Sequence, residues 1–109
     1  MMLIKKRLVK GDGVRFSAQI NGREVGRAYL YILFNDLHSK PFGLLEDVFV
    51  EEGFRGKGIG TSLTKAVIKE AKPLCYKLIA TSRYSRPAVH KLYQGLGFMH
   101  WGKEFRMNF

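Results

Sequence analysis

Residues 44–80 hold the pattern that most restricts how this chain can fold. An apolar stretch, LLEDVFV at 44–50, is followed by a glycine-rich segment and then by an amphipathic run that ends near Pro73. The run repeats mainly apolar residues at helical spacing, namely Leu63, Ala66, Val67, Glu70, Ala71 and Leu74. The stretch YKLIA at 76–80 predicts another strand. A strand, a helix and a strand in this order predict a parallel crossover within a mixed α/β sheet.

The residues before this unit predict an antiparallel meander. Residues 3–10 and 14–20 are short mixed runs separated by Gly11-Asp12-Gly13, a sequence typical of a hairpin turn. Asn21-Gly22 predicts a second tight turn, because both residues tolerate positive φ. The third run, 23–34, becomes nearly all apolar in its second half, which predicts a central strand covered on both faces. Residues 35–43 are predicted to form a loop.

The C-terminal part predicts a second helix followed by a closing hairpin. Apolar residues recur at helical spacing from Ala88 to Leu96, and Gly97 would stop this helix in a left-handed cap. Residues 98–101 and 104–109 are predicted to pair as strands. The fold class is therefore α/β (α+β), with a mixed, mostly antiparallel sheet of about six or seven strands and two main helices. The length predicts a single domain, residues 1–109.

Charge and composition narrow the class of ligand. Nineteen Lys and Arg against nine Asp and Glu give a formal net charge of +10, so the surface attracts polyanions. Nucleic acid is not favoured, because no RNA-recognition or helix-turn-helix signature accompanies the charge. No apolar run approaches the ~20 residues of a membrane span, and the first residues lack the order of a signal peptide, which predicts a cytoplasmic protein without a membrane partner. Cys75, the only cysteine, is expected to be a small buried side chain and not a metal ligand.

The glycine-rich segment is the first candidate for ligand binding. A helix that starts near Gly58 leaves several backbone N–H groups without partners, and Gly56, Gly58 and Gly60 would let a phosphate approach them closely. Arg55 and Lys57 add positive charge. The spacing alone is equally compatible with a plain surface turn, and it matches neither the Walker pattern nor the dinucleotide fingerprint.

Three motifs in this order resemble the GNAT family of N-acetyltransferases. The run from Arg55 to Gly60, between a strand and a helix, resembles the loop with which the family holds the pyrophosphate of coenzyme A (CoA). AVHKLYQGLGF at 88–98 resembles the helix that carries a frequent catalytic tyrosine, and LEDVFV at 45–50 resembles the strand before the loop. The resemblance implies a GNAT-like fold and an enzyme that transfers acetyl from acetyl-CoA to a primary amine.

The resemblance also implies a role for each site residue. Tyr93 would be the general acid, Glu46 the base acting through water, and the strand amide near Val50 the donor to the developing oxyanion. Acetyl-CoA is the implied cosubstrate, without a metal. Its implied contacts are the main-chain groups of Phe49 and Val50, the segment Arg55, Gly56, Lys57, Gly58, Ile59, Gly60 and Thr61, and Arg86, which stands where many members have an asparagine.

Both catalytic assignments have structural alternatives. Tyr93 lies on the apolar stripe of its helix beside Val89 and Leu92, so it could be a packing residue whose hydroxyl finds a partner. Glu46 and Asp47 are adjacent in a strand and are expected to point to opposite faces. At most one of the two carboxylates is therefore expected to face a ligand, and the other would pair with a cation.

The chain departs from the family pattern near its start. Members normally place two helices between the first two strands, and here Gly11-Asp12-Gly13 occupies that place. We therefore expect an acceptor side that is open, or closed by a second subunit in a homodimer. The charge favours a protein or peptide amine over a free polyamine. The alternative class is a catalytically inactive CoA-binding protein or basic interaction protein on the same fold.

Overall fold

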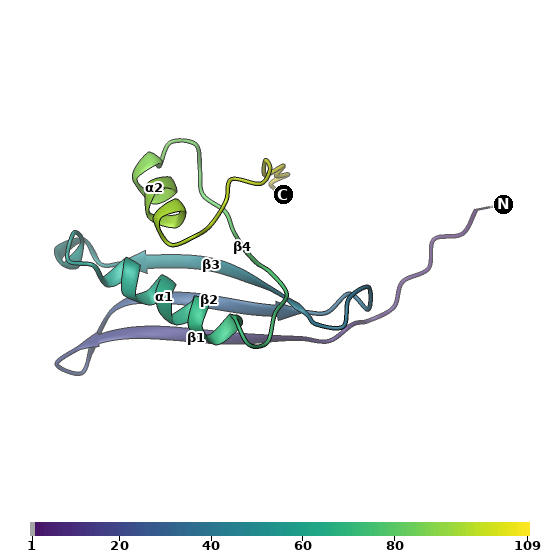
Figure 1. Cartoon of the computed structure of the whole chain (residues 1–109), viewed down its shortest axis with the longest axis horizontal. Coiled ribbons are helices and arrows are strands. Elements are labelled where there is room, and N and C mark those ends of the chain that lie inside the picture. Colours follow the sequence, from purple (N-terminus) through teal and green to yellow (C-terminus); the bar gives the residue numbers. More distant parts are fainter. Residues whose placement is uncertain (1) are drawn as a thin grey trace.

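The computed structural model describes residues 2–109 and shows a mixed α/β fold built on one four-stranded sheet (Figure 1). Its elements follow the order β1 (Gly11–Ile20), β2 (Arg23–Leu33), β3 (Phe42–Val50), the 3₁₀ helix η1 (Glu52–Phe54), α1 (Ile59–Ala71), β4 (Leu78–Ala80) and α2 (Pro87–Gly95). The first three strands are antiparallel neighbours, and β4 joins β3 in parallel. This arrangement confirms the predicted mixed, mostly antiparallel sheet, the parallel crossover and the two main helices.

The sheet of residues 2–109 has four strands, where six or seven were predicted. Residues 3–10 are exposed and lie outside any strand, and residues 98–109 form no hairpin. Gly11-Asp12-Gly13 is not a turn either, because it begins β1. A Cβ on Gly11 would lie 2.9 Å from a Leu33 methyl carbon, and one on Gly13 would lie 3.3 Å from the Tyr31 ring. The two glycines therefore make room for bulky cross-strand neighbours.

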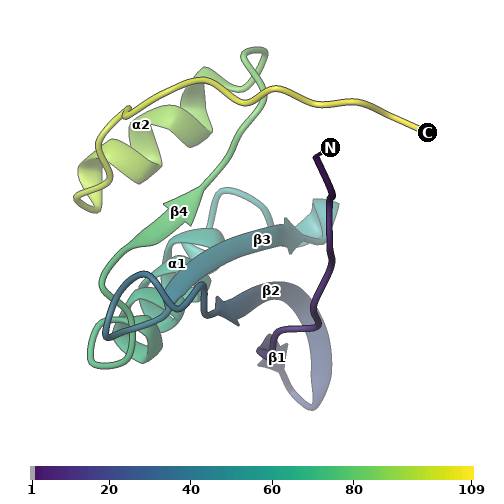
Figure 2. The ribbon, with the colours of Figure 1, turned by 90° about the vertical axis from the view of Figure 1, so that its right-hand side faces the viewer.

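The core lies between the sheet and α1, which packs on one face of the strands (Figure 2). Its buried side chains come from β2, β3, α1 and the turn after α1, and they are Ala28, Leu30, Leu45, Leu63, Val67, Ala71 and Cys75. A Cβ on Gly26 would lie 3.1 Å from the Leu63 side chain and 3.2 Å from Ile59. The missing side chain at this position lets the helix approach β2 closely. Cys75 is free and buried, as predicted.

No helix of residues 2–109 covers the opposite face of β1, β2 and β3 (Figure 2). β2 is the central strand of this meander, as predicted, but Tyr31 on its outer face is 39% exposed, so only one face is covered. Arg15 donates two hydrogen bonds to the Glu24 carboxylate, of 2.6 and 2.8 Å, on this side of the sheet. A polar, ion-paired surface of this kind is suited to contact with water.

Three of the predicted local signals are found where the sequence placed them. Asn21 and Gly22 both have positive φ, of 51° and 79°, in the turn between β1 and β2. Gly58, the residue before α1, is left-handed, and Gly97 has φ 104° shortly after α2. Among residues 2–109 no helix has the length and apolarity that a membrane crossing requires.

Candidate functional site

β3 and β4 separate after a short paired stretch, which leaves half of one β3 edge without a strand. β4 pairs only with residues 43–45, whereas β3 continues along β2 as far as Val50. Within residues 2–109, residues 46–50 therefore have no strand partner on the side of β4. A free strand edge offers main-chain donors and acceptors to an extended ligand.

The main chain of Val50 is directed toward this free edge. The Glu51 N–H donates to the Val25 carbonyl across the β2–β3 ladder at 2.8 Å. Because antiparallel strands alternate the direction of their main-chain groups, the neighbouring N–H and C=O of Val50 face the other way. The Val50 carbonyl accepts a hydrogen bond of 2.8 Å from Nε of Arg55. The Val50 N–H is then the donor that this residue can present to a ligand.

The start of α1 supplies a group of main-chain donors. The first hydrogen bond of the helix runs from the Ser62 N–H to the Gly58 carbonyl, at 3.0 Å. The N–H groups of Gly58, Ile59, Gly60 and Thr61 precede it and have no acceptor within the helix. Such a helix end carries positive partial charge and is suited to an anion such as a phosphate group.

The space in front of these donors is kept open by two glycines with positive φ. Gly56 has φ 76° and Gly58 has φ 83°. A Cβ added to either residue would meet no heavy atom within 4 Å. The left-handed backbone favours glycine at both positions, and the missing side chains leave room for a ligand to reach the main chain.

Gly60 joins the helix start to the free edge of β3. A Cβ on Gly60 would lie 3.8 Å from Cγ2 of Val50, which is ordinary van der Waals contact. The Thr64 hydroxyl donates to the Gly60 carbonyl at 2.8 Å and fixes the first turn of α1. The predicted donors of the loop and of the strand therefore adjoin one another.

Cationic side chains surround the loop. The Arg55 guanidinium lies 5.6 Å from the centroid of the Phe49 ring, and the Arg27 guanidinium lies 4.7 Å from the same centroid. Lys57 places its ammonium 5.5 Å from the centroid of the Phe54 ring. Arg55, Lys57 and Phe49 were predicted at this site, and Arg27 was not. Arg27 gave no signal in the sequence, because only the sheet register brings it beside Phe49.

A β-bulge in β3 sets the direction of the two adjacent carboxylates. Glu46 pairs with Tyr29 and Phe49 pairs with Arg27, so two residues of β3 stand opposite one residue of β2. Asp47 at the bulge has φ 51°. Its carboxylate accepts from Nε of Arg27 at 3.0 Å.

This bulge makes the predicted opposite orientation of Glu46 and Asp47 wrong. Directly paired residues share a face, which places Glu46 on the face of Tyr29, and Arg27 lies on that same face two residues earlier. Asp47 therefore pairs with Arg27 on the same face of the sheet as Glu46. Within residues 2–109 Glu46 makes no ion pair, so its carboxylate is the one available to a ligand.

Tyr93, on α2, is within electrostatic reach of Glu46. Burial raises the pKa of the half-buried Tyr93 hydroxyl above its ordinary value, the charge of Glu46 raises it further, and Arg86 lowers it. The fold thus places Glu46, on β3, and Arg86, the residue that precedes α2, within electrostatic reach of Tyr93. With a raised pKa the Tyr93 hydroxyl keeps its proton at neutral pH and can donate it.

Tyr93 also has a packing role. The centroid of its ring lies 5.3 Å from that of Phe98, and the Phe98 N–H donates to the Tyr93 carbonyl at 3.0 Å. The ring of Tyr93 is thus held by apolar contact, as expected if Tyr93 is a packing residue. Packing of the ring leaves the hydroxyl free for chemistry, so the two roles are compatible.

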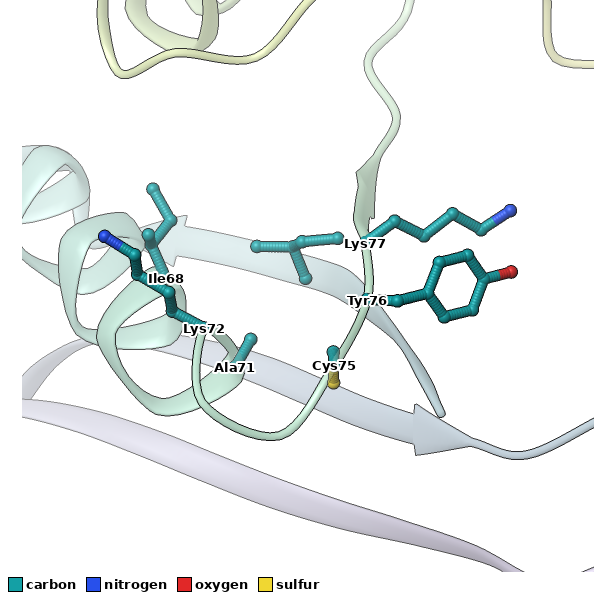
Figure 3. A pocket seen from close by; sticks show the side chains of 7 residues that line it. Ile68, Ala71, Lys72, Cys75, Tyr76 and Lys77 are labelled. Atoms are coloured by element: carbon teal, nitrogen blue, oxygen red, sulfur yellow. The ribbon is translucent and has the colours of Figure 1, made fainter. Parts of the chain in front are cut away.

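Two hollows of the surface lie away from these residues. The larger one, of about 320 Å³, is shown in Figure 3 and is lined by Ile68, Ala71, Lys72, Cys75, Tyr76, Lys77 and Leu78. A smaller one, of about 230 Å³, lies between β1 and α1. Neither contains a predicted site residue. Among residues 2–109 no three His, Cys, Asp or Glu side chains are placed to hold a metal ion.

Comparison with known proteins relates this geometry to a family. The sequence matches the model of the acetyltransferase (GNAT) family over residues 3–98. The structure is similar to a candidate acetyltransferase of Agrobacterium tumefaciens str. C58, with 31% identity, a TM-score of 0.82, and coverage of 88% of this chain and 68% of that one. For an acetyltransferase of Trypanosoma brucei the identity is 30%, the TM-score 0.76, and the coverage 89% and 69%.

A third solved structure is that of an aminoglycoside N-acetyltransferase in complex with CoA. It is 26% identical, with a TM-score of 0.71, and the match covers 86% of this chain and 73% of that one. The present chain therefore spans about two thirds to three quarters of the solved chains that it resembles. No curated protein matches the sequence.

Proposed function

As the chain belongs to the acetyltransferase (GNAT) family, we propose that it is an N-acetyltransferase that moves the acetyl group of acetyl-CoA to a primary amine. The observation that carries the proposal is the set of N–H groups at the start of α1, which adjoins the free edge of β3 beside Val50. A similar protein, the aminoglycoside N-acetyltransferase, was solved with CoA, and another structure of it holds a bisubstrate analogue.

The residues present fit the phosphate end of CoA. The N–H groups of residues 58–61 would hold the pyrophosphate, with Ile59 and Thr61 contributing through their main chains. Arg55 and Lys57 would balance its charge, and the open space at Gly56 would let it approach the backbone. Main-chain groups of Phe49 and Val50 would hold the pantetheine arm along the edge of β3. Arg86 would contact the same arm from the start of α2.

The chemistry of the transfer requires a base, a donor to the carbonyl oxygen and an acid near one another. When bound, acetyl-CoA supplies an acetyl group activated as a thioester. Glu46 takes the proton of the attacking amine, through water, while the nitrogen forms its bond to the acetyl carbon. The Val50 N–H stabilises the negative charge that develops on the thioester oxygen. Tyr93 gives its proton to the sulfur as the carbon–sulfur bond breaks.

We propose a protein or peptide amine as the acceptor. The outer face of β1–β3 carries no helix from residues 2–109, so a bulky acceptor can approach Glu46 from that side. A net charge of +10 repels a free polyamine and attracts an acidic acceptor.

The function is tested by the release of free CoA from acetyl-CoA in the presence of amines, peptides and proteins of both charges. Release that depends on an acceptor supports the proposal. Saturable binding of acetyl-CoA without release for any acceptor would identify a binding protein on the same fold.

A further inference from the structure

The bulge in β3 decides which groups of this strand reach the site. Leu45 is part of the buried core and Val48 packs against it, although the two residues are three positions apart. Regular alternation turns residues three apart to opposite faces, so the extra residue of the bulge brings both to the core. In a strand without the bulge, residues 48–50 would be turned over, and the Val50 N–H would face β2 instead of the free edge.

The bulge contains an unusual backbone conformation at Asp47. Its φ of 51° lies in the left-handed region, which residues other than glycine rarely adopt. Asn21 and Asp36, the other non-glycine residues of 2–109 with positive φ, lie in a turn and in a loop. Asp47 adopts this conformation within a strand, so a local contact is needed to favour it over the extended backbone of a regular strand.

Arg27, on β2, makes that contact. Its Nε donates to Oδ2 of Asp47 at 3.0 Å, and its Nη2 donates to Oδ1 at 3.5 Å. In a strand without the bulge, Asp47 would share the face of Leu45 and would point into the core, away from Arg27. The ion pair is therefore available only when the bulge is formed, and it favours the bulge.

The same guanidinium also supports the residue before Val50. It lies 4.7 Å from the centroid of the Phe49 ring, and the guanidinium of Arg55 lies 5.6 Å from that centroid. Arg55 in turn donates to the Val50 carbonyl at 2.8 Å. Contacts from β2 and from the residue after η1 thus hold the stretch of β3 that ends at the candidate oxyanion donor.

We propose that Arg27 is a positioning residue, which holds Asp47 in the left-handed conformation and so keeps the Val50 N–H directed toward the free edge of β3. The effect on turnover rests on the proposed function, whereas the effect on the conformation of Asp47 does not. The two side chains are 34% and 55% exposed, so the pair adds little to the stability of the whole fold. A small bias is enough at this residue, because aspartate tolerates the left-handed region better than most residues.

The first test is steady-state kinetics of Arg27→Gln with an acceptor that the wild type acetylates. Turnover is expected to fall at least about fivefold, while the Michaelis constant for acetyl-CoA should change by less than about twofold. Arg23→Gln is the matched control, because Arg23 also donates from β2 to a carboxylate, that of Glu51, at 2.6 Å, and Glu51 has an ordinary φ of −58°. Its turnover should stay within about twofold of wild type. A raised Michaelis constant with unchanged turnover would identify Arg27 as a ligand of acetyl-CoA and overturn the proposal.

Two variants of Asp47 separate the backbone conformation from the loss of charge. Asp47→Ala and Asp47→Gly both remove the carboxylate, but only glycine enters the left-handed region without steric cost. Asp47→Ala is expected to lower turnover as Arg27→Gln does, and Asp47→Gly to keep it within about twofold of wild type. The double variant Arg27→Gln with Asp47→Gly should recover that turnover. A double variant as slow as Arg27→Gln would overturn the proposal, because Arg27 would then act other than through Asp47.

NMR of the free protein tests the conformational part without an assay of activity. Positive φ gives Asp47 characteristic backbone carbon shifts, which are expected in the wild type and in Arg23→Gln and should move toward strand values in Arg27→Gln. Unchanged shifts in Arg27→Gln would overturn the proposal. If the wild type released no CoA with any acceptor, the proposed function would fail, and the shifts of Asp47 would still decide the role of Arg27.

Discussion

Burial raises the pKa of the Tyr93 hydroxyl, on α2, and the carboxylate of Glu46, on β3, raises it further. Glu46 lies where β3 leaves β4, and Tyr93 lies on the helix that follows β4. A base and an acid whose charges influence each other are close enough to act on the same amine and thioester. This relationship also favours a protonated Tyr93, which is the form that a proton donor requires.

Tyr93→Phe is expected to lower turnover at least about tenfold, because the proton for the departing sulfur is lost. The Michaelis constant for acetyl-CoA should change by less than about twofold, since the ring and its packing on Phe98 are kept. Tyr84→Phe is the matched control, because Tyr84 is 77% exposed and precedes α2. Steady-state kinetics of the three proteins decide the matter, and equal turnover would remove Tyr93 from the chemistry.

Glu46→Gln is expected to lower the pKa of Tyr93. A negative charge opposes formation of a phenolate, so its removal lets the hydroxyl ionise at a lower pH. The measurement is an NMR titration of the chain labelled at its tyrosines. Glu52→Gln, in η1, removes a carboxylate away from α2 and should leave the titration unchanged. An identical Tyr93 midpoint in wild type and Glu46→Gln would mean that the two groups are too far apart to act together.

Gly60→Ala is expected to weaken the binding of acetyl-CoA without lowering the stability of the fold. Alanine favours a helix over glycine by up to about 1 kcal/mol, and the added Cβ fits at 3.8 Å from Val50, so the free energy of unfolding should not fall. The same methyl group lies where a pyrophosphate would approach the main chain. The dissociation constant for acetyl-CoA should therefore rise at least about tenfold.

Gly95→Ala gives the control for this prediction. Gly95 ends α2, and a Cβ there would meet no heavy atom within 4 Å. This variant should keep its affinity for acetyl-CoA in calorimetric titration while gaining a similar increment of helix stability. If Gly60→Ala bound acetyl-CoA as tightly as Gly95→Ala, the start of α1 would not be the pyrophosphate site.

The carboxylate of Glu24, on the outer face of the sheet, is expected to stay ionised at an unusually low pH. Hydrogen bonds from Arg15, and then from Ser17, lower the pKa of Glu24 from its ordinary 4.5 to about 2. The pair therefore contributes to stability above pH 4.5, and this contribution is lost as the pH falls through about 2. In an NMR titration Arg15→Gln should return the pKa of Glu24 toward 4.5, whereas Arg7→Gln, remote from it, should not. An unshifted Glu24 in wild type would show that the pair is absent in solution.

Local signals in the sequence predicted the elements that surround the candidate site. The apolar stripe of α1, its start near Gly58 and the turn at Asn21-Gly22 each depend on a few neighbouring residues. The same is true of the glycine loop, whose resemblance to one family gave the site residues.

The features that were missed depend on contacts across the sheet. Gly11 and Gly13 lie in a strand because Leu33 and Tyr31 need the space, and a turn signal cannot reveal a cross-strand neighbour. The bulge at Asp47 breaks the alternation that placed the adjacent carboxylates on opposite faces. Residues 98–101 and 104–109 were predicted to pair as a closing hairpin, and the structure of residues 2–109 shows no strand there.

The central claim is tested most directly by assaying free CoA released from acetyl-CoA across a panel of small amines, peptides and proteins of both charges. The account predicts release that requires an acceptor, is fastest with a protein or peptide amine, is lost in Tyr93→Phe and is retained in Tyr84→Phe. Saturable binding of acetyl-CoA with no release for any acceptor would contradict it, and so would binding that depends on nucleic acid and not on acetyl-CoA.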